Sequence, residues 1–190
     1  MRQALDFLYR ASGALAAMFL VGICVVVLLQ VGANAIDKAI ALAGGEPIGL
    51  LVPSYAEFAG FFLAASSFLA LAYTLRHGGH IRVSLLIQHL GAGPRRVIEL
   101  WCLLASGLLV GYFAVFASNL VLDSLEFGDL STGMVAVPLW IPQSALALGL
   151  IVLTIALVDE FVRVAMGRLP SYHGKGEGLL ADSGSDPDAL

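Results

Sequence analysis

The chain has 190 residues, of which 59% are hydrophobic and only 13% are charged, and its mean hydropathy is +0.90. About 25% of the residues of a soluble domain are charged, so this composition leaves too little polar surface for a water-soluble globule. The formal net charge of −4, without a basic block, argues against nucleic-acid binding, and the two cysteines are too few for a disulfide scaffold.

Four long stretches without a charged residue predict four membrane spans. About 20 apolar residues, rising 1.5 Å each as a helix, cross a hydrocarbon core of about 30 Å. The fourth stretch is overlong, and Pro138 and Pro142 indicate where its helix begins, because proline is tolerated in a first turn. We therefore predict transmembrane helices over about residues 11–36, 53–75, 97–122 and 138–158.

Helices fit these spans better than strands do. Lipid offers no hydrogen-bond partner to the backbone, and a barrel would need alternating apolar and polar residues, whereas runs such as 19–29 are apolar throughout. We expect an all-α integral membrane protein with four transmembrane helices. The first span, with 26 uncharged residues, is longer than the 7–15 typical of a signal peptide, which favours a retained helix.

Three further segments complete the expected organisation. Residues 1–10 form either an amphipathic segment along the inner surface or the frayed start of the first helix. Residues 80–90 carry apolar side chains at helical spacing but are too short to cross the bilayer, which predicts an amphipathic interfacial helix between the second and third spans. Residues 11–168 would be the membrane domain, and 169–190, rich in Gly, Ser and Asp, a disordered cytoplasmic tail.

The lysines and arginines predict the orientation. The two terminal segments and the connection between the second and third spans hold nine of them, and the other two connections hold one. Short cytoplasmic segments retain Lys and Arg. We therefore expect both termini in the cytoplasm, with the acidic loop after residue 122 outside.

The sequence offers little that resembles an active site. The span interiors contain no Asp, Glu, Lys, Arg or His, the residues that mark ion paths and proton relays inside membranes. We expect no catalytic, substrate-binding or metal site, no cofactor and no enzymatic activity. A haem- or quinone-binding anchor subunit of a respiratory oxidoreductase is the alternative, although His77, His80 and His89 lie in one short stretch rather than on facing helices.

Two motifs carry a family resemblance. The stretch 75–86 (LRHGGHIRVSLL) resembles the signature after the second helix of the small permease subunit of tripartite ATP-independent periplasmic (TRAP) transporters, the DctQ-like family. The stretch 138–143 (PLWIPQ) resembles the start of the last helix in that family, and 54–57 (SYAE) the start of the second. At the start of the second helix, family members often have two adjacent carboxylates, whereas this chain has only Glu57. Ser84 stands at a position where family members frequently have an Asp. The motif residues that become candidates for partner or interface contacts are Glu57, Arg76, Gly79, His80, Ile81, Arg82, Val83, Pro138, Trp140, Pro142 and Gln143.

The resemblance implies a function that the residues alone do not give. A TRAP transporter is a sodium-coupled, ATP-independent secondary transporter for organic acids in the bacterial inner membrane. Its small subunit would be a non-catalytic scaffold that contacts membrane lipids and braces a large membrane subunit, a separate chain. A periplasmic receptor protein would deliver the solute.

Overall fold

The computed structural model describes residues 2–46, 48–77 and 92–167. The expected interfacial helix over 80–90 and the tail over 169–190 lie outside these residues. Within them the chain forms the helices α1 (Arg2–Leu42), α2 (Tyr55–Arg76), α4 (Ala92–Phe127) and α5 (Trp140–Ala165). All four are long and apolar enough to cross a membrane, and the described residues contain no strand beyond one isolated bridge between Leu130 and Pro138. The all-α architecture with four spanning helices is confirmed.

α1 and α4 extend beyond the predicted spans at both ends, and α5 extends beyond its predicted span at the C-terminal end. α1 is one uninterrupted helix of 41 residues, so residues 2–10 continue directly into the span. α4 has 36 residues, and α5 begins at Trp140 and continues to Ala165. The spans were bounded by charged residues, and a charge limits burial in lipid without ending the backbone ladder of a helix. At 1.5 Å per residue α1 measures about 60 Å, twice the hydrocarbon thickness.

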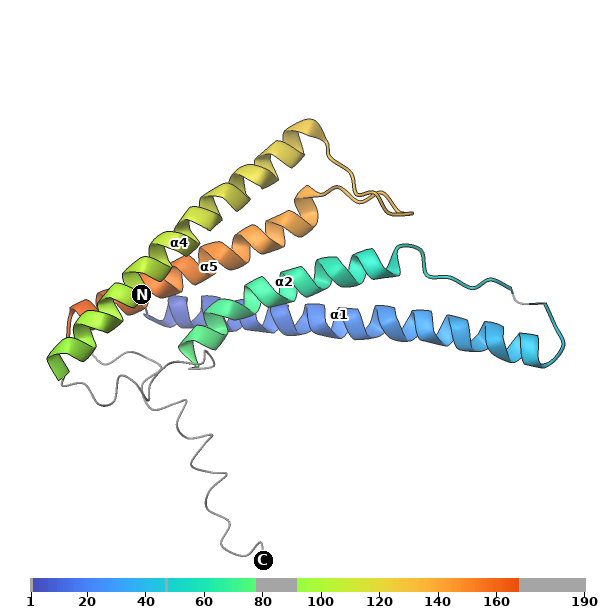
Figure 1. The fold of residues 1–190 in the computed structure, drawn as a ribbon, viewed down its shortest axis with the longest axis horizontal. Helices are drawn as coiled ribbons and strands as arrows, with labels where there is room; N and C mark the ends of the chain where they lie inside the picture. The colour runs from blue at the N-terminus through green and yellow to red at the C-terminus, as the bar shows by residue number, and fades with distance from the viewer. Residues whose placement is uncertain (1, 47, 78–91, 168–190) are drawn as a thin grey trace, which may run out of the picture.

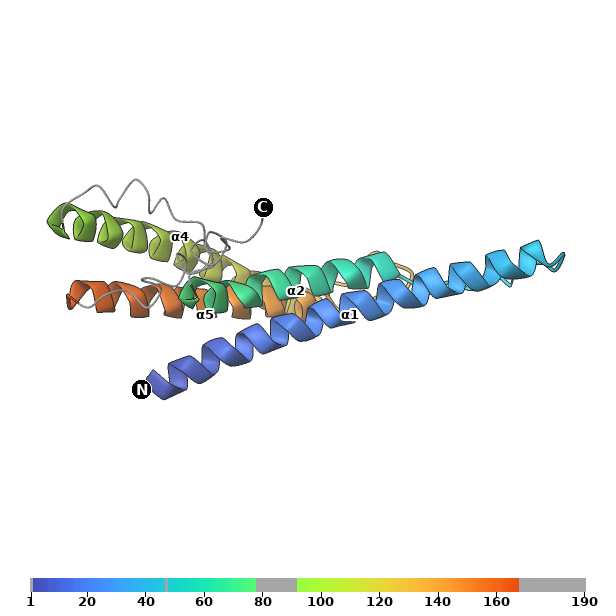
Figure 2. The same ribbon diagram turned by 90° about the horizontal axis from the view of Figure 1, so that it is seen from below.

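The helices form an open row rather than a closed bundle. α2 packs on α1 at one side and on α5 at the other, and α4 packs on α5, which gives the order α1–α2–α5–α4 (Figures 1 and 2). We call the end with the connections 43–54 and 128–139 the loop end. The opposite end, with the start of α1, is the terminal end. α2 and α5 approach each other closely where Gly149 of α5 meets the backbone of Phe68 in α2.

Small residues and aromatic rings set the helix contacts. A Cβ on Gly13 would lie 2.8 Å from the ring of Tyr73, so α1 can approach α2 closely only with glycine there. Ser12 Oγ, one residue earlier, donates a hydrogen bond to the carbonyl oxygen of Leu69. Without a hydrophobic force between helices in lipid, such close packing and hydrogen bonds drive association.

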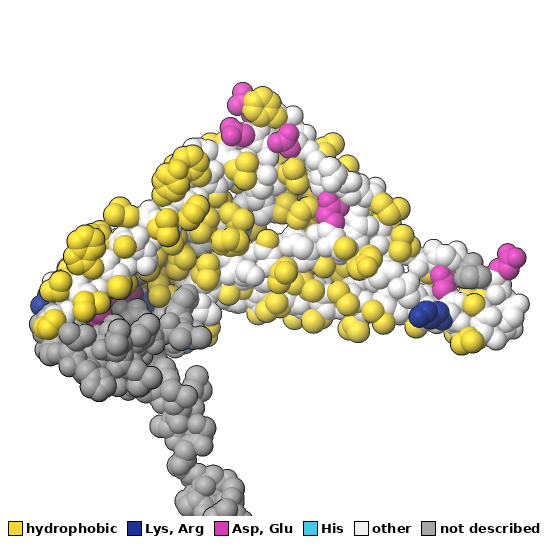
Figure 3. Space-filling view, in the orientation of Figure 1, with side chains coloured by type: hydrophobic (Ala, Val, Ile, Leu, Met, Phe, Trp, Pro, Cys, Tyr) yellow, Lys and Arg dark blue, Asp and Glu magenta, His cyan; other side chains and the backbone are white. Residues whose placement is uncertain are grey.

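The larger of two buried clusters in the described residues lies toward the terminal end, where α1, α2, α4 and α5 meet. Its members come from all four helices and are Tyr9, Ala72, Leu75, Leu103, Val152, Leu153, Ala156, Leu157 and Val164. Away from this core the helix surfaces are covered by hydrophobic side chains, and acidic side chains gather at the loop end of α4 (Figure 3). A row with so much exposed apolar surface suits lipid or another membrane protein as its surroundings.

Candidate functional site

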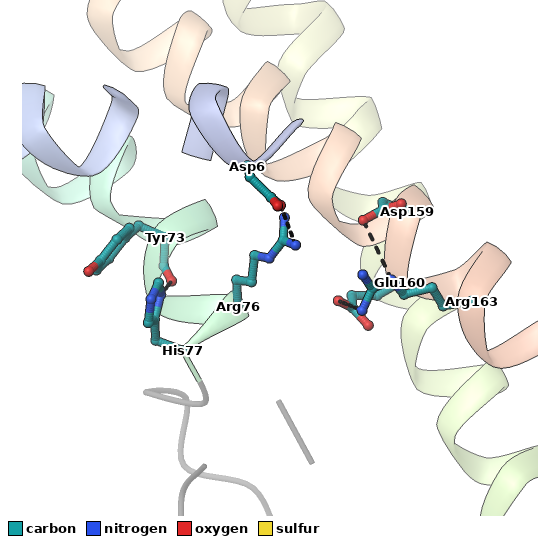
Figure 4. A network of polar contacts seen from close by, with 7 residues as sticks. All are labelled: Asp6, Tyr73, Arg76, His77, Asp159, Glu160 and Arg163. Atoms are coloured by element: carbon teal, nitrogen blue, oxygen red, sulfur yellow. Dashed lines mark hydrogen bonds and ion pairs between the residues drawn. The ribbon is translucent and has the colours of Figure 1, made fainter. Parts of the chain in front are cut away.

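Charged side chains from three helices gather in a cluster at the terminal end (Figure 4). Arg76 of α2 forms an ion pair with Asp6 of α1, and its guanidinium lies 5.2 Å from the centroid of the Tyr9 ring. On α5, Arg163 lies 3.9 Å from Glu160 and 4.0 Å from Asp159. The cluster therefore ties the start of α1 to α2 and keeps the charges of α5 paired.

Two side chains of this cluster are buried, so their pairing matters for the stability of the fold. Glu160 is only 3% exposed and Tyr9 2%. A buried carboxylate is strongly destabilising unless it is paired, so Arg163 and Glu160 must act as a unit. The cluster lacks a nucleophile with an adjacent base, and its chemistry is that of a structural joint between helices.

Arg96 of α4 completes the joint at the end of α5. Its Nε donates a hydrogen bond to the carbonyl oxygen of Val164 at 3.2 Å, and Nη2 donates to that of Ala165 at 2.8 Å. The last carbonyls of a helix have no intrahelical donor and carry partial negative charge, so a guanidinium there is doubly favourable. Gly167 follows with φ +80°, a conformation that favours glycine and ends the helix.

Polar side chains of α1 also hold the first connection, residues 43–54, against this helix at the loop end. The Gln30 side chain accepts a hydrogen bond from the backbone N–H of Val52 at 2.8 Å. Both oxygens of Asp37 accept backbone N–H groups, from Ile48 at 3.2 Å and Leu50 at 2.8 Å. Residues 48–52 therefore lie along the last turns of α1.

The second connection, residues 128–139, contacts the start of α2. The backbone N–H of Val135 donates a hydrogen bond to Ser54 Oγ at 3.0 Å. Gly133 lies directly against Glu57: a Cβ at position 133 would overlap Oε2 of that carboxylate and approach Ser54 Oγ to 2.7 Å. A side chain at position 133 would therefore displace the Glu57 carboxylate, and the contact links segments that are far apart in the sequence.

A cavity of about 480 Å³ opens at this junction. Leu51, Val52 and Ser54–Glu57 line it from one side and Thr132–Met134 from the other. Among the described residues no hydrogen-bond donor reaches Oε2 of Glu57, although this atom is buried. The cavity thus combines apolar walls with a carboxylate oxygen that is not satisfied within the described part of the chain.

The sequence candidates separate into three groups. Glu57 lies at the loop end beside the second connection, and Arg76 lies at the terminal end in the charged cluster. The four candidates around the start of α5 are near the loop end, with Pro138 bridged to Leu130, Pro142 in the first turn of α5, and Trp140 38% exposed. The remaining five, Gly79, His80, Ile81, Arg82 and Val83, lie outside the described residues.

Several polar contacts were not singled out from the sequence. Asp6, Gln30, Arg96 and Gly133 each make a contact to a different element. The only sequence feature that marks Gln30 for a contact is its polar side chain within an apolar run. For the other three no local pattern identifies the partner.

The His77 side chain makes local contacts within α2. Its ring stacks on Tyr73 at 4.0 Å between centroids, and its Nδ1 lies 2.8 Å from the carbonyl oxygen of Tyr73 (Figure 4). Within the part of the chain that the structure describes, no three His, Cys, Asp or Glu side chains are placed to hold a metal ion. The haem- or quinone-anchor alternative finds no support.

Comparison with known families accounts for most of the membrane domain. The family model described as "Tripartite ATP-independent periplasmic transporters, DctQ component" matches residues 50–167, more than half of the chain. No curated protein and no solved structure matches the chain. The matched region contains α2, α4 and α5, together with the Glu57 junction and most of the charged cluster. The chain therefore belongs to the DctQ family and is a small, multi-pass membrane subunit of a TRAP transporter.

Proposed function

We propose that this chain is the non-catalytic scaffold subunit of a sodium-coupled organic-acid transporter, and that it braces a large membrane subunit encoded as a separate chain. The observation that carries the proposal is the open helix row, whose apolar faces are largely uncovered. A row of this kind supplies surface for a membrane partner. The sodium coupling, the organic-acid substrate and the periplasmic receptor rest on the family resemblance.

The positions of the charged residues favour a scaffold role for this chain over a role in carrying the solute. In α1, residues 11–36 are uncharged, and in α2, α4 and α5 the charged residues lie near the helix ends. Solute and ion pathways through membranes are marked by ionisable residues at membrane depth. The described helices have no Asp, Glu, Lys, Arg or His at membrane depth, so the proposal assigns the solute path to the partner.

One face of α4 is the best candidate for the partner contact. α4 packs against α5 and leaves Tyr112, Phe113 and Phe116 more than half exposed. The Tyr112 ring lies 4.5 Å from that of Phe116 and 6.0 Å from that of Phe113, so the three rings form one aromatic surface. Aromatic side chains dominate protein interfaces because they bury large, rigid surfaces.

Affinity purification from native membranes tests the brace. The tagged chain should recover one large membrane chain in fixed proportion. The double substitution Tyr112→Ala and Phe116→Ala should lower that recovery by about tenfold or more, since central aromatic contacts contribute about 2 kcal/mol or more each. Leu28→Ala with Leu29→Ala, equally exposed on α1, is the matched control and should leave recovery unchanged. Equal recovery in both variants would contradict the assignment of the partner contact to the α4 face. If the unmodified chain recovers no large membrane chain, the proposed bracing role is wrong.

The orientation is a second proposal. With nine of the ten basic residues in alternate segments, both termini would be cytoplasmic in the bacterial inner membrane, and the loop end would be extracytoplasmic. Reporter fusions after Arg10, Lys38, Arg82, Asp129 and Lys175 should report inside, outside, inside, outside and inside. The reverse order would place the loop end in the cytoplasm. The interfacial helix over 80–90 and the separate roles of residues 1–10 and 169–190 remain predictions from the sequence.

A further inference from the structure

The Glu57 cavity has the chemistry of a socket for a basic side chain. Two connections and the first turn of α2 build it, and its residues are neighbours only because the second connection folds back onto α2. A carboxylate lines one wall. Leu51 and Met134, both more than half exposed, provide apolar surface beside it.

The state of Glu57 contrasts with that of Asp37 at the same end of the molecule. Asp37 uses both oxygens to accept backbone N–H groups, which is a structural role. Oε2 of Glu57 is buried beneath Gly133 and accepts no hydrogen bond from any described residue. Leaving a buried carboxylate oxygen unpaired costs free energy, and an ammonium or guanidinium group that pairs with the same carboxylate from the cavity would offset that cost.

The surrounding charge favours a cation as well. The described residues of the loop end include Asp37, Glu46, Glu57, Asp123, Glu126 and Asp129, against Lys38 alone among basic residues. The resulting field attracts a basic surface over several ångströms before contact.

We propose that this cavity receives a lysine or arginine side chain from the soluble extracytoplasmic component of the transporter. The aliphatic stem of that residue packs on Leu51 and Met134, and its charged group pairs with Glu57. The inference rests on the proposed function and on the loop end being extracytoplasmic.

The position of the cavity distinguishes a soluble partner from a membrane-embedded one. Its lining comes from the two loop-end connections and the first turn of α2, and from no residue nearer the middle of a helix. The carboxylates of both connections need water or headgroups around them. A protein arriving from the aqueous phase reaches this surface directly, and charge steering accelerates such encounters.

Binding measurements on the intact membrane complex test the proposal. The probe is the purified soluble receptor encoded with this transporter, applied to the complex of this chain and its large partner in nanodiscs. Glu57→Gln keeps the shape of the side chain and removes its charge, and it should raise the Kd about tenfold or more, because removing one member of a buried charge pair mainly speeds dissociation. Glu57→Asp should retain part of the affinity. Glu126→Gln, also an acidic residue of the loop end, should change the Kd less than twofold.

The salt dependence and a cross-link supply independent readouts. Raising the ionic strength should weaken binding to the unmodified complex more than binding to the Glu57→Gln complex. A photo-reactive benzoylphenylalanine replacing Met134 should form its adduct with the receptor. An unchanged Kd in Glu57→Gln, or no receptor binding to the unmodified complex, overturns the proposal.

Other occupants would give different results. Loss of the large subunit on Glu57→Gln would assign the cavity to the membrane partner, and loss of a bound phospholipid, detected by native mass spectrometry, would assign it to a lipid. Both results overturn the soluble-partner assignment while leaving the brace intact. Failure of the brace itself shows earlier, as absence of the large subunit from preparations of the unmodified chain.

Discussion

Replacing Gly149 with alanine should separate α5 from α2 and lower the stability of the folded protein. A Cβ at this position would lie 2.5 Å from the carbonyl carbon of Phe68 and 2.7 Å from its oxygen. Both atoms belong to the backbone of α2, so they cannot move aside as a side chain would. Overpacking of this kind costs about 1–3 kcal/mol, and the rigid neighbour places Gly149→Ala toward the upper value.

Thermal unfolding of the purified protein in detergent measures the effect. For a chain of this size we expect a Tm about 4–10 °C lower, taking about 2–4 °C per kcal/mol. Gly60→Ala is the matched control, because a Cβ at Gly60 of α2 would meet no atom within 4 Å. Alanine favours the helix over glycine, so this control should not lose stability. Equal melting of the two variants would contradict the close crossing of α2 and α5.

The membrane spans could be predicted from the sequence because lipid imposes a simple rule. Charged residues such as Arg10 and Asp37 bracket apolar runs of spanning length, and the backbone in between must be helical. The same rule misplaces helix ends. The α1 backbone continues through Arg10 and past Asp37, since a helix needs no apolar side chains once it leaves the hydrocarbon.

The order of the helices could not be predicted, because apolar side chains surround each span and mark no preferred face. The neighbours are decided by local shape: Gly13 accepts the ring of Tyr73, and Gly149 accepts the backbone of Phe68. Many glycines occur in the sequence, and nothing local distinguishes these two from Gly60, which meets no neighbour.

The candidate site was predicted in part. Glu57 was singled out as a carboxylate at the start of a span, and the structure places it against the second connection. Its contact with Gly133 could not be predicted, because the two residues are 76 positions apart and a single sequence does not report such contacts. Arg96 was counted only as a basic residue that sets orientation, whereas it donates to the last carbonyls of α5. The motif residues 79–83 stay predictions.

Omitting this chain should abolish solute uptake by a reconstituted transporter. In the proposed function this chain would supply a fixed surface for the large subunit, so the large subunit alone should lose uptake almost completely. Conversely, liposomes that contain this chain alone should transport nothing, because its described helices place no ionisable residue at mid-membrane. Both expectations follow from assigning the solute path to the partner.

Uptake of the labelled organic acid that the receptor binds most tightly, driven by a sodium gradient into liposomes, is the decisive measurement. The account predicts uptake when this chain, the large subunit and the receptor are all present, and background counts when this chain is omitted or is the only membrane protein. Gradient-dependent uptake by liposomes holding this chain as their only membrane protein would contradict it.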